Sequence, residues 1–139
     1  MTDRFVFDTG RVFDFVRSQM PFNAVEGMVG IGFERDGELI AGVMYEGYNG
    51  HNIWMHVAAL PDKRWLTRSY MKVCFAYPFV QLGVSRISGY VNASNTLARR
   101  FDEHLGFKEE ARLRGAAADG GDVIIYAMRK EECKYVGPQ

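Results

Sequence analysis

The sequence predicts an α+β fold, in which a mixed, mostly antiparallel sheet of about six to seven strands is flanked by helices. Segments that alternate apolar and polar residues, as strands with one buried face do, are separated by turn pairs such as Asp36-Gly37 and Asn49-Gly50. Between them lie segments whose apolar residues recur every three to four positions, as in helices that pack on a sheet. With 139 residues, of which 47% are hydrophobic, residues 1–139 are expected to form a single domain.

A short strand and an amphipathic helix are expected at the N-terminus. The strand covers residues 4–8, and Asp8 or Thr9 is placed to cap the helix that follows. Pro21 ends this helix, because proline cannot continue its backbone hydrogen bonding. The helix has one apolar face, formed by Val12, Phe13, Val16 and Met20.

Three antiparallel strands are expected next. Residues 28–48 alternate on both sides of the turn pair Asp36-Gly37, which predicts a hairpin. The turn pair Asn49-Gly50 then leads into a strand over residues 51–60. Consecutive strands joined by such short turns are antiparallel neighbours.

A long helix is expected after Pro61 and Asp62, which break the preceding strand. Pro78 kinks or ends this helix and leaves residues 79–83 as a wider turn. The buried stripe of the helix consists of Leu66, Tyr70, Val73, Cys74 and Tyr77.

The last part of the chain is expected to fold as strand, helix and hairpin. A strand over residues 85–91 leads into a polar turn, where Asn92, Ser94 or Asn95 offers a side-chain oxygen to cap a short helix. Gly106 ends this helix, because glycine tolerates the left-handed conformation. The stripe Leu97, Phe101 and Leu105 lies on one helix face, and strands over 107–113 and 123–128 follow, with residues 115–122 as their loop.

Charge and cysteine content narrow the functional classes. Seventeen basic and seventeen acidic residues give no net charge, so bulk attraction to nucleic acid or to a membrane surface is not expected. Two cysteines are too few for a disulfide framework, which favours a reduced, cytoplasmic setting. The histidines and cysteines show no metal-ligand spacing, so we expect no metal site.

The order of elements and one motif together resemble a known family. Asn95-x-x-Ala98-x-x-Phe101 runs into Leu105-Gly106-Phe107, and the acidic Glu110 and a basic residue, Arg112 or Arg114, follow on the next strand. This pattern resembles the GNAT N-acetyltransferases, and within them the branch that includes the ribosomal-protein N-terminal acetyltransferases. The likeness spans about residues 28–129.

The resemblance implies a binding site for acetyl-CoA between two splayed parallel strands, here residues 51–60 and 85–91. It implies that backbone groups of Val57, Ala58 and Ala59 pair with the pantetheine arm. It also implies that Asn95, besides capping its helix, contacts the pantetheine amide or a bound water. Arg100, like Arg99, either reaches the CoA phosphates or belongs to a solvated helix face.

The pyrophosphate is implied at the start of the helix after Pro61, where unpaired N–H groups favour anions. The family pattern there is Gln/Arg-x-x-Gly-x-Gly/Ala. This chain keeps a basic first residue and replaces both small residues by Thr67 and Ser69, whose hydroxyls can bond phosphate oxygens. Trp65 lines either the cofactor or a partner surface. The whole turn reads Arg64, Trp65, Leu66, Thr67, Arg68 and Ser69.

Two residues are candidates for the general base that deprotonates an amine. His56, midway along its strand, has an intrinsic pKa suited to the task. Glu46 on the neighbouring strand is the carboxylate alternative. Many family members have a tyrosine at the position of Asp102 as general acid for the leaving thiolate. An aspartic acid can replace it only if burial raises its pKa, and Tyr90, Tyr126 or bulk water are the alternatives.

The function that the resemblance implies is acetyl transfer from acetyl-CoA to a primary amine of a protein N-terminus, a lysine or a small molecule. The alternative is a non-catalytic domain of the same fold that binds a protein partner, or CoA without turnover. The sequence leaves a homodimer open.

Overall fold

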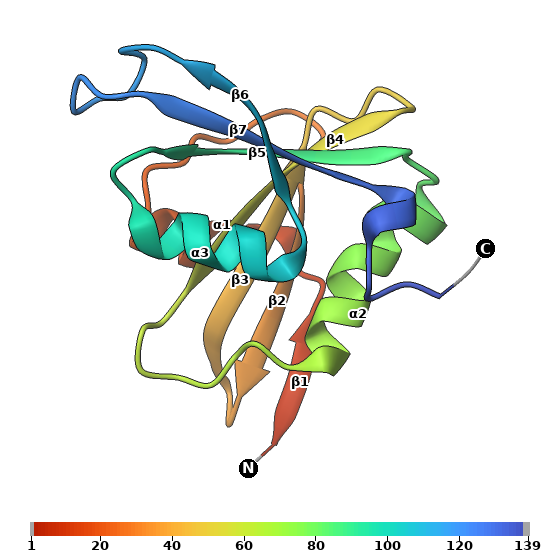
Figure 1. Cartoon of the computed structure of the whole chain (residues 1–139). Coiled ribbons are helices and arrows are strands. Elements are labelled where there is room, and N and C mark those ends of the chain that lie inside the picture. The colour runs from red at the N-terminus through yellow and green to blue at the C-terminus, as the bar shows by residue number, and fades with distance from the viewer. Residues whose placement is uncertain (1, 138–139) are drawn as a thin grey trace.

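A computed structural model describes residues 2–137 as one sheet with helices on both faces (Figure 1). Seven strands pair in the order β1-β2-β3-β4-β5-β7-β6, which confirms the predicted mixed sheet. The strands are β1 (Asp3–Val6), β2 (Val29–Arg35), β3 (Glu38–Glu46), β4 (Asn52–Ala59), β5 (Arg86–Asn92), β6 (Lys108–Leu113) and β7 (Val123–Arg129). The helices are α1 (Thr9–Gln19), α2 (Arg68–Ala76) and α3 (Thr96–Leu105), with short helical turns at Tyr77–Gln81 and Lys130–Glu132.

The strand pairs are antiparallel except for β4 and β5, which run parallel. The predicted hairpin is confirmed: β2 and β3 are joined at Asp36 and Gly37, whose φ angles of 52° and 86° are those of a tight two-residue turn. Because β4 and β5 are parallel, the chain must cross over between them, and α2 forms this crossover.

Helix α1 packs on one face of the sheet at very close range. Its Val12 and Val16 are completely buried. A Cβ atom placed on Gly30 would lie 2.8 Å from Cβ of Val12 and 2.8 Å from Sδ of Met44. The helix therefore needs a strand residue without a side chain at this position.

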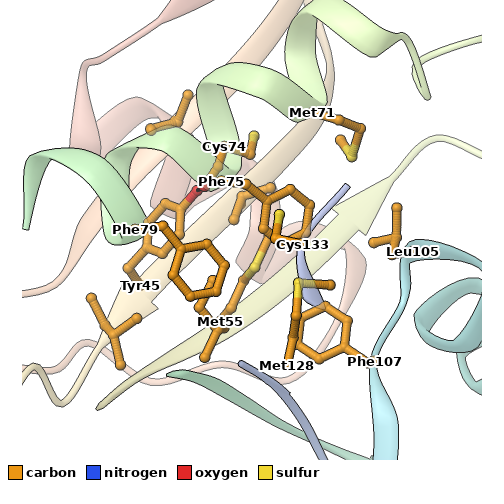
Figure 2. Packing of buried hydrophobic residues seen from close by; sticks show 14 of the residues in the cluster. Tyr45, Met55, Met71, Cys74, Phe75, Phe79, Leu105, Phe107, Met128 and Cys133 are labelled. Atoms are coloured by element: carbon orange, nitrogen blue, oxygen red, sulfur yellow. Dashed lines mark hydrogen bonds between the residues drawn. The ribbon is translucent and has the colours of Figure 1, made fainter. Parts of the chain in front are cut away.

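Helices α2 and α3 cover the opposite face (Figure 1). Figure 2 shows Phe75 and Phe79, from α2 and the turn after it, packed with Met55, Phe107 and Met128. Two buried tyrosine hydroxyls tie α2 to the sheet: that of Tyr70 donates to the carbonyl oxygen of Ile31 at 2.7 Å, and that of Tyr45 donates to the carbonyl of Cys74.

The prediction that a helix starts at Pro61 is wrong. Helix α2 begins at Arg68, because the hydroxyl of Thr67 accepts the N–H of Tyr70 at 3.2 Å and caps it there. Leu66 therefore lies outside the helix. Helix α2 ends at Ala76, next to Pro78 as predicted, because proline removes one helical N–H. The wider turn expected over residues 79–83 starts two residues earlier, as the π-helical turn Tyr77–Gln81.

Helix α3 has the predicted ends but only part of the predicted stripe. The side chain of Asn95 accepts the N–H of Ala98 at 3.1 Å, and Gly106 closes the helix with a φ of 112°. Of the predicted stripe, Leu105 is buried and Phe101 is half-buried, whereas Leu97 is 77% exposed, so the stripe packs only toward its C-terminal end. Among the residues that the structure describes, no helix is long and apolar enough to cross a membrane.

Candidate functional site

The parallel strands β4 and β5 separate after a short region of pairing. Their paired residues run only from Asn52 opposite Arg86 to Trp54 opposite Ser88. Beyond that point β4 continues to Ala59 and β5 to Asn92, and the described residues add no further rungs between them. The facing edges of both strands are thus open to hydrogen bonding by a ligand.

A cleft of about 650 Å³ occupies this gap. Its walls come from β4, β5 and α3, with the end of α1 and the loop between β6 and β7 at its margins. The lining residues are Gln19, Met20, Pro21, Met55, His56, Val57, Ala58, Ala59, Gly89, Tyr90, Val91, Asn92, Asn95, Ala98, Phe101, Asp102, Leu105, Phe107, Ala116, Ala117, Ala118 and Val123.

His56 and Glu46, the two candidates for the general base, are in direct contact. Nε2 of His56 lies 3.1 Å from Oε2 of Glu46, and the histidine side chain is almost fully buried. A carboxylate only accepts hydrogen bonds, so Nε2 carries a proton and the neutral ring has its free electron pair on Nδ1. Burial lowers the pKa of His56, although the carboxylate of Glu46 acts in the opposite direction. The ring is therefore neutral near pH 7 and can accept a proton.

The free nitrogen of His56 is accessible from the cleft. No side-chain nitrogen or oxygen of the described residues is both fully buried and unpaired. Nδ1 of His56 forms no hydrogen bond with the described residues, so it keeps contact with the space that the ring lines. The cleft is thus lined by a neutral base, whose other ring nitrogen is hydrogen-bonded to the carboxylate of Glu46.

Asp102 lines the cleft from α3 and carries the second perturbed group. Burial, and to a smaller extent the nearby charge of Glu103, raise its pKa to about 7. Its carboxyl group forms no ion pair or hydrogen bond with the described part of the chain. It is therefore partly protonated at neutral pH and able to donate a proton.

His56 and Asp102 approach the gap from opposite faces of the sheet. The ring of His56 contacts Phe22, which follows α1, at a centroid distance of 4.9 Å. The preceding residue, Met55, instead belongs to the core beneath α2 and α3. Since successive strand residues point to opposite faces, the base lies on the α1 face and the acid on the α3 face.

Some of the residues predicted for CoA meet in the cleft. Val57, Ala58, Ala59 and Asn95 line it, whereas Arg100 does not. Arg99 donates to the carbonyl oxygen of Ala93 at 3.2 Å, so its guanidinium is used within the fold. Gln19 and Met20, at the end of α1, were not predicted to line the cleft, because only tertiary packing brings them there.

None of the six residues of the predicted phosphate turn, 64–69, lines the cleft. The ring of Trp65 packs between the helices, 5.1 Å from Phe101 and 6.5 Å from Tyr70. The hydroxyl of Thr67 caps α2, which leaves the N–H groups of Arg68 and Ser69 without a partner among the described residues. These two groups and the basic side chains beside them fit an anion at the start of α2.

In the described range, residues 2–137, no group of three or more His, Cys, Asp and Glu side chains is arranged to hold a metal ion.

The comparison with solved structures is the one that bears on the fold. No protein-family model matches the chain, and no curated protein matches its sequence. Solved structures do match. A mutant of the spermidine N-acetyltransferase SpeG from Vibrio cholerae superposes with a TM-score of 0.75 and 18% identity, over 99% of this chain and 98% of that one.

Two further SpeG structures give the same result. A chimera of the Vibrio cholerae enzyme with hSSAT reaches a TM-score of 0.77 at 14% identity, over 99% of this chain and 100% of that one. The spermidine/spermine N-acetyltransferase SpeG in complex with manganese ions reaches 0.73 at 17% identity, over 94% and 92%. The expected GNAT fold is confirmed.

Proposed function

We propose that this protein transfers an acetyl group from acetyl-CoA to a primary amine. The observation that carries the proposal is the neutral His56, held by Glu46 and presented to the gap between two splayed strands. A base that is neutral at physiological pH can take the proton that an attacking amine must lose. The shared fold with spermidine N-acetyltransferases supports the same chemistry.

The donor fits the open strand edges. Val57, Ala58 and Ala59 line the cleft beyond the paired part of β4. We assign their backbone groups to the amides of the pantetheine arm, which would bond them as an added strand would. Acetyl-CoA supplies the activated acyl group as a thioester. We assign its phosphates to the N–H groups of Arg68 and Ser69 and to the side chains around them, which include Arg64 and Thr67.

The proposed reaction has two proton transfers, one on each side of the gap. Nδ1 of His56 takes a proton from the amine, whose nitrogen forms a bond to the thioester carbonyl carbon. An N–H group from Val57 to Ala59 stabilises the developing oxyanion. The carbon–sulfur bond then breaks, and protonated Asp102 gives its proton to the departing thiolate on the opposite face. Tyr126 is excluded as donor to the thiolate, because it is fully buried and its hydroxyl donates to Glu103 at 2.7 Å.

The acceptor is proposed to be a small amine, since the similar solved structures are named for spermidine. A protein N-terminus, as in the ribosomal-protein branch, and a lysine side chain are the other acceptors to test. The buried free thiols of Cys74 and Cys133 support a reducing compartment such as the cytoplasm. Whether the working form is a homodimer is decided by its mass in solution.

Two measurements in sequence test the proposal. Acetyl-CoA at millimolar concentration is expected to raise the thermal midpoint, because a ligand that binds the native state stabilises it. Release of free thiol with a panel of primary amines then reports turnover. His56→Gln is expected to keep the thermal shift and lose the turnover, whereas the exposed His104→Gln keeps both.

A thermal shift without thiol release from any amine would instead establish the rival function, a non-catalytic domain that binds CoA. No thermal shift at all would refute the acetyltransferase proposal.

A further inference from the structure

We propose that the acceptor is a primary monoamine with an apolar or aromatic body, bound on the α1 face of the cleft. This inference rests on the acetyl transfer proposed above and names the substrate class of the same site. It differs from the polyamine named for the structurally similar enzymes.

The position of His56 fixes the side from which the amine approaches. An amine must reach the base that deprotonates it, and the ring of His56 lies on the α1 face, against Phe22. Ala58, two residues further along β4, belongs to the same cluster as Val12 and Val16 of α1. The body of the acceptor is therefore held by whatever surrounds His56 on this face.

Aromatic and apolar side chains surround the base. The ring of Tyr90 lies 5.4 Å from the ring of His56 and meets it edge-on, and Trp54 stands 6.0 Å behind Tyr90. Met20 and Pro21 complete the wall from the end of α1. Tyr90 is 55% exposed although it lines the cleft, so a ligand has aromatic surface to cover.

The charges around the cleft do not suit a polyamine. Of the described lining residues, only Asp102 carries a carboxyl group, and it lies on α3 at the opposite face. The carboxylate of Glu46 is bound to His56 and is not part of the lining. The second and third ammonium groups of a polyamine would lose water without gaining a partner, which is costly. An apolar body gains instead from the surface that it removes from water.

The test compares the catalytic efficiency, kcat/KM, for phenethylamine, hexylamine and spermidine by thiol release from acetyl-CoA. Phenethylamine is expected to exceed spermidine by roughly tenfold or more, a factor that corresponds to about 1.4 kcal/mol. Tyr90→Ala should raise KM for phenethylamine roughly tenfold, and Tyr90→Phe, which keeps the ring, should preserve it. Tyr48→Ala removes an exposed tyrosine outside the lining and should change nothing.

Equal or better turnover of spermidine would overturn the inference and leave the acetyltransferase proposal standing, as would an unchanged KM in Tyr90→Ala. If no amine is turned over, the proposed function fails. Calorimetry in the presence of CoA then tests whether an amine binds at the proposed acceptor site. Heat of binding with phenethylamine that disappears in Tyr90→Ala supports the site, and its absence in the unaltered protein overturns it.

Discussion

Replacing Asp102 by asparagine should stabilise the protein, and by more at alkaline than at acidic pH. The pKa of Asp102 is raised from 3.8 to about 7, so the folded state holds on to a proton that the unfolded chain has already lost. A group of this kind contributes its full stability below about pH 4 and loses it as the pH rises through about 7. Asparagine has no charge to bury and escapes this loss.

The size of the effect follows from the two pKa values. Each pKa unit corresponds to about 1.4 kcal/mol, so the ionised carboxylate costs about 4 kcal/mol at pH values above about 7. At about pH 5 the cost is only about 1.7 kcal/mol, because the folded state is still protonated. The amount by which Asp102→Asn raises the free energy of unfolding should therefore grow by about 2.5 kcal/mol between about pH 5 and about pH 8.

Urea unfolding at the two pH values, at constant ionic strength, measures this difference. Other titrating groups are common to both proteins and cancel in the comparison. Asp14→Asn, which removes an exposed carboxylate of α1, is the matched control and should show no such growth. If the gain in stability from Asp102→Asn is equal at both pH values, or larger at the acidic one, the assignment of a half-buried, protonated carboxyl group to the cleft is refuted.

Further predictions concern the base, the packing of α1 and the cap of α3. His56→Gln should lower kcat by about 100-fold or more, and activity should fall as the pH drops through the lowered pKa of His56, below 6.5. Glu46→Gln should lower kcat and move this acid limb of the pH–rate profile to lower pH, because the carboxylate raises the pKa of His56. Gly30→Ala should lower the free energy of unfolding, measured with urea, by about 1–3 kcal/mol, since its Cβ would lie 2.8 Å from atoms of α1 and β3. In the control Gly10→Ala, the nearest atom to the new Cβ lies at 3.6 Å, and no stability should be lost. Asn95→Ala should cost about 1 kcal/mol and Asn95→Asp far less, as only the latter keeps a capping oxygen.

Elements whose signals are local could be predicted from the sequence. The hairpin at Asp36-Gly37, the cap at Asn95 and the stop at Gly106 each depend on the chemistry of one or two residues, and each is found where predicted. The start of α2 could not be predicted. Pro61 and Thr67 both mark a helix start, but the segment between them forms a turn at residues 61–62 and then runs on without a helix. In this segment Trp65 packs against Phe101 of α3.

Only part of the candidate site could be predicted from the sequence. Glu46 and His56 were alternatives in the sequence, and the structure joins them. Their contact follows from register: Glu46 pairs with Trp54, so His56 is its diagonal neighbour on the same face. The raised pKa of Asp102 depends instead on burial by residues far along the chain, which no local pattern encodes.

Hydrogen exchange with and without acetyl-CoA tests most directly whether the donor binds between β4 and β5. If the donor binds there, acetyl-CoA slows the exchange of amides in β4 from Met55 to Ala59 and at the start of α2, while the exchange of the turn at Asp36 and Gly37 is unchanged. Protection confined to any other part of the chain, or none at millimolar acetyl-CoA, would contradict it.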